Sequence, residues 1–334
     1  MRLAWAVLFA LSVVAVAPIG AALAENRQGD DDSRHDRTYD HIFVVVEENT
    51  EFSNVIGNTA QFPTVNALAN RYGLATNYYG TIHPSEGNYV SLVGGDDYNI
   101  QDDAPYQTHQ IAKPSLVDQL EQAHLTWKGY FQNLPVAGFT GNCYPSSAAC
   151  LYASKHNGFV NFTHVASSPS EMAKLVPDTN LMDDLVTGDV PNFAFIAPDQ
   201  CHDEHGLSVC PDPQLSQGTD AYLKTTVEAI MRSDMWERGR NALVITFDEG
   251  DSDLGCCDGG DDPTTNGGGR VVTVVIRNHQ ERALQDATAY NHHSLVATLQ
   301  EAFGLGCTFN DQPVGDTCDR QSGVQPMEPL FGLR

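Results

Sequence analysis

Long apolar runs that end in acidic residues constrain the fold of this chain more than any other feature. The clearest runs cover residues 42–46, 193–197 and 242–247, and none of them contains an internal Gly or Pro. Such runs are typical of strands that are buried on both faces of a parallel sheet. Because helical patterns alternate with them, the sequence predicts an α/β fold with a doubly wound, mostly parallel sheet and helices on both faces.

Side chains that bind metal ions follow each of these runs, and another opens a helical stretch near residue 292. In chain order the candidate ligands are Glu48, Asn49, Asp203, His205, Asp248, Glu249 and His292, with Asp199 as an alternative to Asp203. The ligand site of an open α/β sheet lies beyond the carboxyl ends of its strands, so we expect these side chains to meet there. This ligand set predicts divalent metal ions and leaves zinc, manganese, iron, calcium and magnesium open.

A serine stands where a further helix is predicted to begin. Ser85 opens a helical stretch over residues 85–93, which ends at Gly94 and Gly95. A serine in this place is most often a cap. The alternative is a nucleophile, because the N–H groups at a helix N-terminus hold a phosphate and a metal ion in contact with the hydroxyl lowers its pKa. Asn88, one turn later on the same helix face, is then placed to bind a phosphate oxygen.

The two ends of the predicted domain differ sharply in composition. Residues 1–24 carry a basic start, an apolar stretch and a small-residue cleavage site, which together predict a secretory signal peptide. Residues 25–38 are nearly all polar and predict a disordered lead-in. We expect residues 39–334 to form one domain and to carry an irregular loop or cap over the site at about residues 132–180. Within this loop, Lys155 and His156 are either phosphate-binding residues or an ordinary surface pair.

Charge and cysteine content narrow the function further. The net charge of −25 argues against nucleic acid as a partner, and no Lys/Arg cluster offsets it. No segment after the signal is apolar enough to span a bilayer, so we predict a secreted protein, extracellular or periplasmic, without stable membrane insertion. Eight cysteines in an exported chain predict disulfides. Local spacing pairs Cys143 with Cys150, Cys201 with Cys210 and Cys307 with Cys318, while Cys256 and Cys257 bridge each other or exchange with these pairs.

Several of these motifs together resemble one known family. Residues 44–49, with Phe52, resemble the "V-V-V-x-E-N-x-S-F" opening of the bacterial phosphoesterases. The resemblance continues in the same order through residues 83–89, 155–156, 203–205, 246–249 and 291–292. That family contains secreted acid phosphatases and phospholipases C and belongs to the alkaline phosphatase superfamily. The chain is most similar to the acid phosphatase branch, some of whose members act on phosphoinositides.

The resemblance implies phosphoryl transfer that is assisted by metal ions. It places Glu48, Asn49, Asp248 and Glu249 around the nucleophile Ser85, with Asp203, His205 and His292 as a second set of ligands. Ser85 then forms a phosphoserine intermediate, Asn88 and the metals carry the developing charge, and His205 or His292 protonates the leaving alkoxide.

We therefore expect a phosphomonoesterase that acts on small phosphate esters or phospholipid head groups. Two other functions stay open, which are a phosphodiesterase of the phospholipase C type and an exported calcium-binding module without enzymatic activity. The sequence carries no prediction of oligomeric state.

Overall fold

An eight-stranded sheet forms the centre of the protein, in the order β10-β2-β9-β8-β1-β7-β3-β6. Its strands are β1 (His41–Glu47), β2 (Gly73–Tyr79), β3 (Trp127–Phe131), β6 (Leu175–Pro177), β7 (Phe193–Ala197), β8 (Asn241–Phe247), β9 (Arg270–Arg277) and β10 (Leu284–Asn291). β1 runs parallel to β7 and β8, β3 runs parallel to β7 and β6, and β2 runs parallel to β10. Only β9 runs antiparallel to its two neighbours within this sheet. The predicted α/β fold with a mostly parallel sheet is confirmed.

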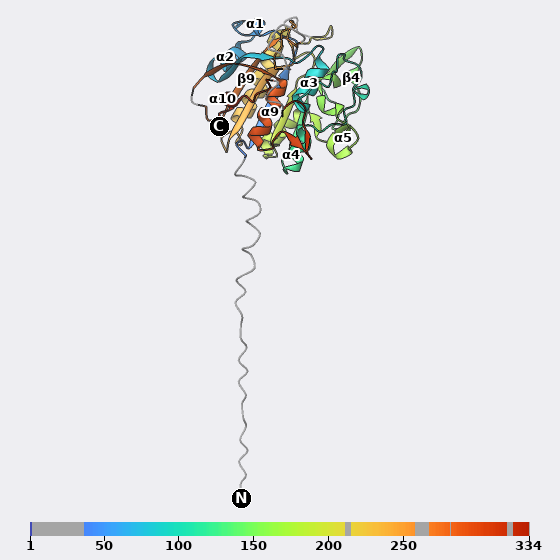
Figure 1. Ribbon diagram of the computed structural model, residues 1–334, viewed down its shortest axis with the longest axis vertical. Coiled ribbons are helices and arrows are strands. Elements are labelled where there is room, and N and C mark those ends of the chain that lie inside the picture. The colour runs from blue at the N-terminus through green and yellow to red at the C-terminus, as the bar shows by residue number, and fades with distance from the viewer. Residues whose placement is uncertain (2–36, 211–214, 258–266, 281, 319–322, 334) are drawn as a thin grey trace. The chain divides into compact units, whose positions relative to one another are not determined.

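This computed structural model describes residues 1, 37–210, 215–257, 267–280, 282–318 and 323–333 (Figure 1). The residues from Arg37 onward fall into one unit. The predicted signal peptide, apart from Met1, and residues 25–36 of the predicted lead-in lie outside the described residues. No helix in the described ranges is long and apolar enough to cross a bilayer.

The helices form two packed groups. The longer ones are α2 (Pro63–Arg71), α3 (Ser85–Gly94), α4 (Leu116–Gln122), α7 (Thr179–Thr187), α8 (Leu215–Arg232) and α9 (His292–Phe303). α3, α4 and α9 pack on one another (Figure 1). α8 packs on α2 and α7. Every residue of β7 and β8 is buried, and side chains alternate between the two faces of a strand, so both faces of the central sheet are covered.

Local signals set the ends of several helices, and α3 ends at the glycine pair that the sequence predicts. α3 ends at Gly95 and α9 ends at Gly304, which have left-handed backbone angles (φ 69° and 68°) that favour glycine. At the start of α4, the Ser115 N–H donates to Asp118 Oδ2 at 2.7 Å. Asn291 caps α9 by accepting from the Ser294 N–H at 3.1 Å.

The segment over residues 132–180 contains short elements rather than one irregular loop. It holds a hairpin of β4 (Cys143–Ser146) and β5 (Ala149–Ala153), the 3₁₀ turns η2 (Ser154–His156) and η3 (Gly158–Asn161), and the short helices α5 (Thr163–Ala166) and α6 (Pro169–Met172). β6 follows and joins the edge of the main sheet. The remaining short elements are η1 (Tyr106–Thr108), α1 (Phe52–Val55), α10 (Glu328–Phe331), β11 (Thr308–Phe309) and β12 (Gln312–Pro313).

All three predicted local disulfides are present, and the two adjacent cysteines bridge each other. The pairs are Cys143–Cys150, Cys201–Cys210, Cys307–Cys318 and Cys256–Cys257.

Candidate active site

The loops that follow β1, β7 and β8 are tied together at the carboxyl edge of the sheet. The N–H of Glu48, just after β1, donates to the carbonyl of Asp203 at 2.6 Å. The N–H of the next residue, Asn49, donates to Asp248 Oδ1 at 3.0 Å, just after β8. Because the three strands are parallel neighbours, their ends meet at one edge. Three of the four predicted polar clusters therefore meet here, and the fourth joins them through His292, whose Nε2 contacts the Asp248 carbonyl.

A buried group of Glu48, His156 and Asp203 forms the centre of this edge. Glu48 Oε1 lies 2.6 Å from His156 Nε2, and Asp203 Oδ2 lies 3.2 Å from His156 Nδ1. The imidazole also stacks on the ring of Tyr89 in α3, with centroids 5.0 Å apart. Despite the short approaches, Glu48 Oε1, His156 Nε2 and Asp203 Oδ2 have no well-aligned hydrogen bond among the described residues.

This group fits a metal ion. Each of the three residues offers one ligand atom, and these atoms lie within 4.8 Å of one another. Buried polar atoms that lack hydrogen bonds are costly, and a cation between them would satisfy their lone pairs. One imidazole with two carboxylates is a donor set that suits zinc, manganese or iron. The sequence placed Glu48 and Asp203 among the ligands but assigned His156 to the substrate phosphate.

The charges within the group are strongly coupled. Burial lowers the pKa of His156, but the negative charge of Glu48 and the close approach of both acids outweigh it and raise the pKa to about 9. Burial likewise works against ionised Glu48, yet His156 lowers the pKa of that carboxyl to about 2. Burial raises the pKa of Asp203 to about 7. Without a metal ion, the protein therefore holds a positively charged imidazole between the two acids. A bound metal ion would supply positive charge at the same place.

Asp248 presents a second unsatisfied oxygen close by. Its Oδ1 accepts from the N–H groups of Asn49 and Glu249, at 3.0 and 2.6 Å. Its Oδ2 is buried and has no hydrogen-bond partner in the described part of the chain. Burial raises the pKa of Asp248 well above its usual range, and the charges of Glu48 and Glu249 add to this effect. An oxygen in this state is a natural cation ligand.

Ser85 lies at the start of α3 with its hydroxyl unused. The residue is only 2% exposed, and its Oγ makes no hydrogen bond within the described residues. The next turns of α3 reach the groups described above, because Tyr89 stacks on His156 and Asn88 Nδ2 donates to Glu249 Oε2 at 3.1 Å. Glu249 Oε2 is also bound by His83 Nδ1 at 2.9 Å, just before the serine. The predicted nucleophile therefore begins a helix whose first turns contact the acid and imidazole groups.

Asn88 lies beside the site, but its amide serves the protein itself. Its Oδ1 accepts from the N–H groups of Thr81 and Ile82, at 2.8 and 3.2 Å. Its Nδ2 donates to the Ile82 carbonyl at 2.6 Å as well as to Glu249. The side chain thus fixes the turn that leads into Ser85, and these bonds occupy its donors and its acceptor.

A positively charged side chain reaches the N-terminal end of α3. Asp103 Oδ1 accepts from the N–H of Glu86, the second residue of the helix, at 3.1 Å. The other oxygen of Asp103 pairs with Lys155 Nζ at 3.0 Å. Burial works against the charge of Lys155, but Glu48 and Asp103 outweigh it and raise the pKa of the amine. The sequence predicted a role for Lys155 and missed Asp103, whose only signal was its place in an acidic loop.

The two remaining histidines point their ring nitrogens at protein groups. His205 Nε2 lies 3.2 Å from Lys155 Nζ and its Nδ1 lies 3.1 Å from the Gly206 carbonyl, so Nε2 accepts and Nδ1 donates. Burial lowers the pKa of His205 and favours this neutral form. His292 Nε2 lies 2.6 Å from the Asp248 carbonyl and its Nδ1 lies 3.1 Å from the Tyr78 hydroxyl. Binding a metal would require either ring to give up one of these partners.

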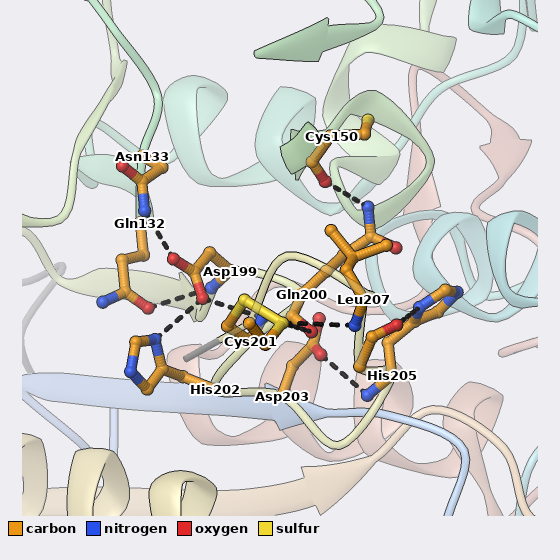
Figure 2. Close-up of a disulfide and its surroundings, with 12 residues drawn as sticks. Gln132, Asn133, Cys150, Asp199, Gln200, Cys201, His202, Asp203, His205 and Leu207 are labelled. Atoms are coloured by element: carbon orange, nitrogen blue, oxygen red, sulfur yellow. Dashed lines mark hydrogen bonds and ion pairs between the residues drawn. A yellow bond between two sulfur atoms is a disulfide. The ribbon is translucent and has the colours of Figure 1, made fainter. Parts of the chain in front are cut away.

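The loop after β7 is shaped by the Cys201–Cys210 disulfide (Figure 2). Asp199 accepts from the Cys201 N–H at 2.9 Å, binds His202 Nδ1 at 2.8 Å and contacts the amide of Asn133. Asp203 instead turns to the buried group, and its Oδ1 accepts from the His205 N–H at 2.9 Å. Asp199 therefore holds the loop in shape, while Asp203 contacts His156.

Comparisons with known proteins identify phosphoesterases and phosphatases that are similar to this chain. A model of the phosphoesterase family matches residues 58–306. The phosphatidylinositol-3-phosphatase of Mycobacterium tuberculosis is 28% identical over 84% of this chain and 83% of its own length. The phosphate-repressible acid phosphatase of Penicillium chrysogenum is 27% identical over 80% of this chain and 60% of its own length. The acid phosphatase of Aspergillus fumigatus is 26% identical, and the chain spans 55% of it. The chain thus spans somewhat over half the length of these fungal relatives.

Solved structures share the fold at low sequence identity. A protein of the alkaline phosphatase superfamily from Vibrio parahaemolyticus is similar, with a TM-score of 0.53, 12% identity, and coverage of 80% of this chain and 67% of its own. A phosphonate monoester hydrolase from Silicibacter pomeroyi is similar, with a TM-score of 0.51, 10% identity, and coverage of 88% of this chain and 77% of its own.

Proposed function

This chain belongs to the phosphoesterase family, and we propose on that basis that it is an exported, metal-dependent phosphomonoesterase of the acid phosphatase type. One observation supports the proposal above all others. Buried oxygen and nitrogen atoms that could bind a metal ion, and that lack hydrogen bonds, lie beside the helix that begins with Ser85. The predicted disulfides are formed, which fits the oxidising compartment expected for an exported protein.

The proposed metal ligands come from two neighbouring sets. Glu48, His156 and Asp203 would hold one ion, and the oxygens of Asn49, Asp248 and Glu249 offer further ligands on the side of Ser85. A divalent cation here would lower the pKa of the Ser85 hydroxyl and offset the negative charge of a bound phosphate. His205 and His292 stay candidate ligands only if their rings turn away from Lys155 and the Asp248 carbonyl.

The chemistry then follows from the residues around α3. Ser85 Oγ attacks phosphorus in line, the P–O bond to the leaving alcohol breaks, and a phosphoserine forms that water hydrolyses. The ammonium of Lys155 stabilises the phosphate oxygens, and the N-terminus of α3, whose Glu86 N–H donates to Asp103 Oδ1, adds the positive end of its dipole. Once Lys155 Nζ turns from His205 Nε2 to the phosphate, that nitrogen can take up a proton at acidic pH and pass it to the leaving alkoxide. Asn88 acts by holding the turn before Ser85 in place.

Substitution of Ser85 tests this proposal. We expect Ser85→Ala to lower kcat for p-nitrophenyl phosphate by roughly a thousandfold or more, because the nucleophile is lost, while thermal stability stays the same. Ser91→Ala is a matched control in the same helix, since the Ser91 hydroxyl only binds protein groups. Near-normal hydrolysis by Ser85→Ala would contradict the assignment. A choline phosphodiester assayed beside the monoester separates this function from a phospholipase C, and the absence of turnover with either ester would favour a binding module.

A further inference from the structure

A carboxylate lies at the start of α3, in the loop that joins this helix to η1. Asp103 is in the middle of the loop, and its side chain is 29% exposed. Ile100 and Tyr106, on either side of it, are buried. The loop is therefore fixed at both ends, and a rotation of the Asp103 side chain into the solvent leaves those ends in place.

Both oxygens of Asp103 contact groups that the proposed reaction places beside the phosphate. Its Oδ1 accepts from the Glu86 N–H at 3.1 Å, one residue after the proposed nucleophile. Its Oδ2 pairs with Lys155 Nζ at 3.0 Å. A helix N-terminus and an ammonium group together form a binding site for an anion. Asp103 therefore fills, with its own carboxylate, the position where we expect two phosphate oxygens to bind.

The charge of Asp103 also reaches the acids of the candidate site. Burial raises the pKa of Glu249, and the negative charges of Glu48 and Asp103 add to this rise. Burial raises the pKa of Glu86 as well, and Asp103 acts in the same direction. Asp103 is therefore close to the acids that would bind a metal ion and to the cation that would bind phosphate, although the proposed reaction gives it no part.

The ion pair between Asp103 and Lys155 is weak enough for a phosphate to replace. The Lys155 side chain is 18% exposed, so water reaches both partners, and ion pairs of this kind contribute little to stability. A phosphate monoester carries about two negative charges at neutral pH, whereas Asp103 carries a single charge. A bound ester would therefore gain more from these contacts than the carboxylate does.

We propose that Asp103 occupies the phosphate position of the free enzyme and competes with both substrate and product phosphate for Lys155 and the start of α3. The inference rests on the proposed phosphomonoesterase function and names a residue that regulates its site. Phosphate binds only to molecules in which Asp103 has turned away, so its apparent affinity falls with the fraction of those molecules. Inhibition by product phosphate is weakened for the same reason.

Removing the charge of Asp103 tests the competition. We would measure kcat and KM for p-nitrophenyl phosphate, Ki for inorganic phosphate, and the Kd of inorganic phosphate by calorimetry with the metal-loaded enzyme. Asp103→Asn keeps the size of the side chain. It should lower KM, Ki and Kd by roughly three- to tenfold, while kcat stays within about twofold of the wild type.

Asp102→Asn is the matched control, because it removes the same charge from the neighbouring residue of the loop. Asp102 binds other groups, since its Oδ1 accepts from the Ala104 N–H at 2.9 Å and lies 3.3 Å from His109 Nε2. Its side chain is 67% exposed, so salt and water screen its charge. All four constants should therefore stay within about twofold of the wild type.

A double-mutant cycle with Lys155→Met separates competition from general repulsion between Asp103 and phosphate. Without Lys155, Asp103 loses one of its two partners and blocks the site less often. Asp103→Asn should then tighten phosphate binding by a smaller factor in the Lys155→Met background than in the wild type. A charge that only repels phosphate would instead give the same gain in both backgrounds.

The outcomes separate this inference from the proposed function. If the wild type hydrolyses the ester but Asp103→Asn weakens phosphate binding or leaves it unchanged, the competition is refuted and the phosphatase proposal stands. Equal gains from Asp102→Asn and Asp103→Asn, or equal gains with and without Lys155, would refute the competition too. If the wild type hydrolyses no monoester, the proposed function fails, while tighter calorimetric binding of phosphate by Asp103→Asn still supports the competition.

Discussion

Replacing Asn88 by alanine distinguishes a positioning side chain from a phosphate ligand. The residue is fully buried, and its Oδ1 holds the N–H groups of Thr81 and Ile82. Its Nδ2 holds the Ile82 carbonyl and Glu249. Each buried polar group that loses its partner costs about 1–3 kcal/mol, and these costs overlap when the groups are neighbours. We therefore expect Asn88→Ala to lower the free energy of unfolding by about 3–4 kcal/mol.

The assay is urea unfolding under non-reducing conditions, followed by circular dichroism and set beside the rate of p-nitrophenyl phosphate hydrolysis. Ser85→Ala provides the contrast, because the Ser85 hydroxyl has no partner among the described residues and its loss should change stability by less than about 0.5 kcal/mol. Asn88→Asp keeps an acceptor for Thr81 and Ile82 but places a carboxylate beside Glu249, so its penalty should shrink as the pH falls and one acid takes up a proton. If Asn88→Ala unfolded within about 1 kcal/mol of the wild type while losing its activity, the positioning role would be refuted and a phosphate contact supported.

Three further predictions concern the metal, the phosphate and pH. Dialysis against EDTA should abolish turnover and lower the melting temperature, with zinc or manganese restoring both; activity that survives full chelation would exclude metal dependence. Lys155→Met should lower kcat/KM for phosphate esters by roughly tenfold or more and weaken inhibition by inorganic phosphate, and unchanged inhibition would place the phosphate elsewhere. Burial opposes ionised Asp286, but hydrogen bonds from Thr288 and Tyr290 outweigh it and hold the pKa of this carboxyl below its usual value of 3.8. A lowered carboxyl pKa contributes stability above the unfolded value and loses it as the pH falls through the folded value, so Asp286→Asn should lower the melting temperature at pH 7 by calorimetry. That difference should close as the pH falls below the folded pKa of Asp286, and a constant difference would contradict the ionic origin.

The centre of the sheet was predictable because burial on both faces leaves a clear pattern in the sequence. β1, β7 and β8 lie in the middle of the sheet, and each coincides with a predicted apolar run. The edge strands β6 and β10 carry no such pattern, since an edge strand needs no continuous apolar face. β10 has several exposed residues, and β6 has three residues in all, so neither differs from loop sequence.

The members of the candidate site were more predictable than their roles. Strand ends brought Glu48, Asp203 and Asp248 together, as expected for parallel neighbours. The direction of an imidazole, by contrast, depends on partners that are far away in the chain. His156 turned out to lie between two buried acids rather than in an exposed loop, while His292 turned to a main-chain carbonyl. Residue type predicts which chemistry is available, but the tertiary contacts decide which nitrogen is free to perform it.

The acidity of the chain and its proposed anionic substrate are reconciled by burial. Ionised carboxylates at this edge repel one another and are poorly solvated, so the pKa of Asp203 is raised to about 7 and that of Asp248 is also raised. Part of their charge is thus removed by protons before any phosphate approaches, and His156 offsets part of the rest. Lys155 and the start of α3, which both contact Asp103, then bring the positive groups of the site next to its acids within a chain whose net charge is −25. A metal ion would displace those protons. Lowering the pH and removing the metal should therefore act on the same buried groups. The effect of metal removal should then be smaller at acid pH, and the effect of acid pH should be smaller once the metal is removed.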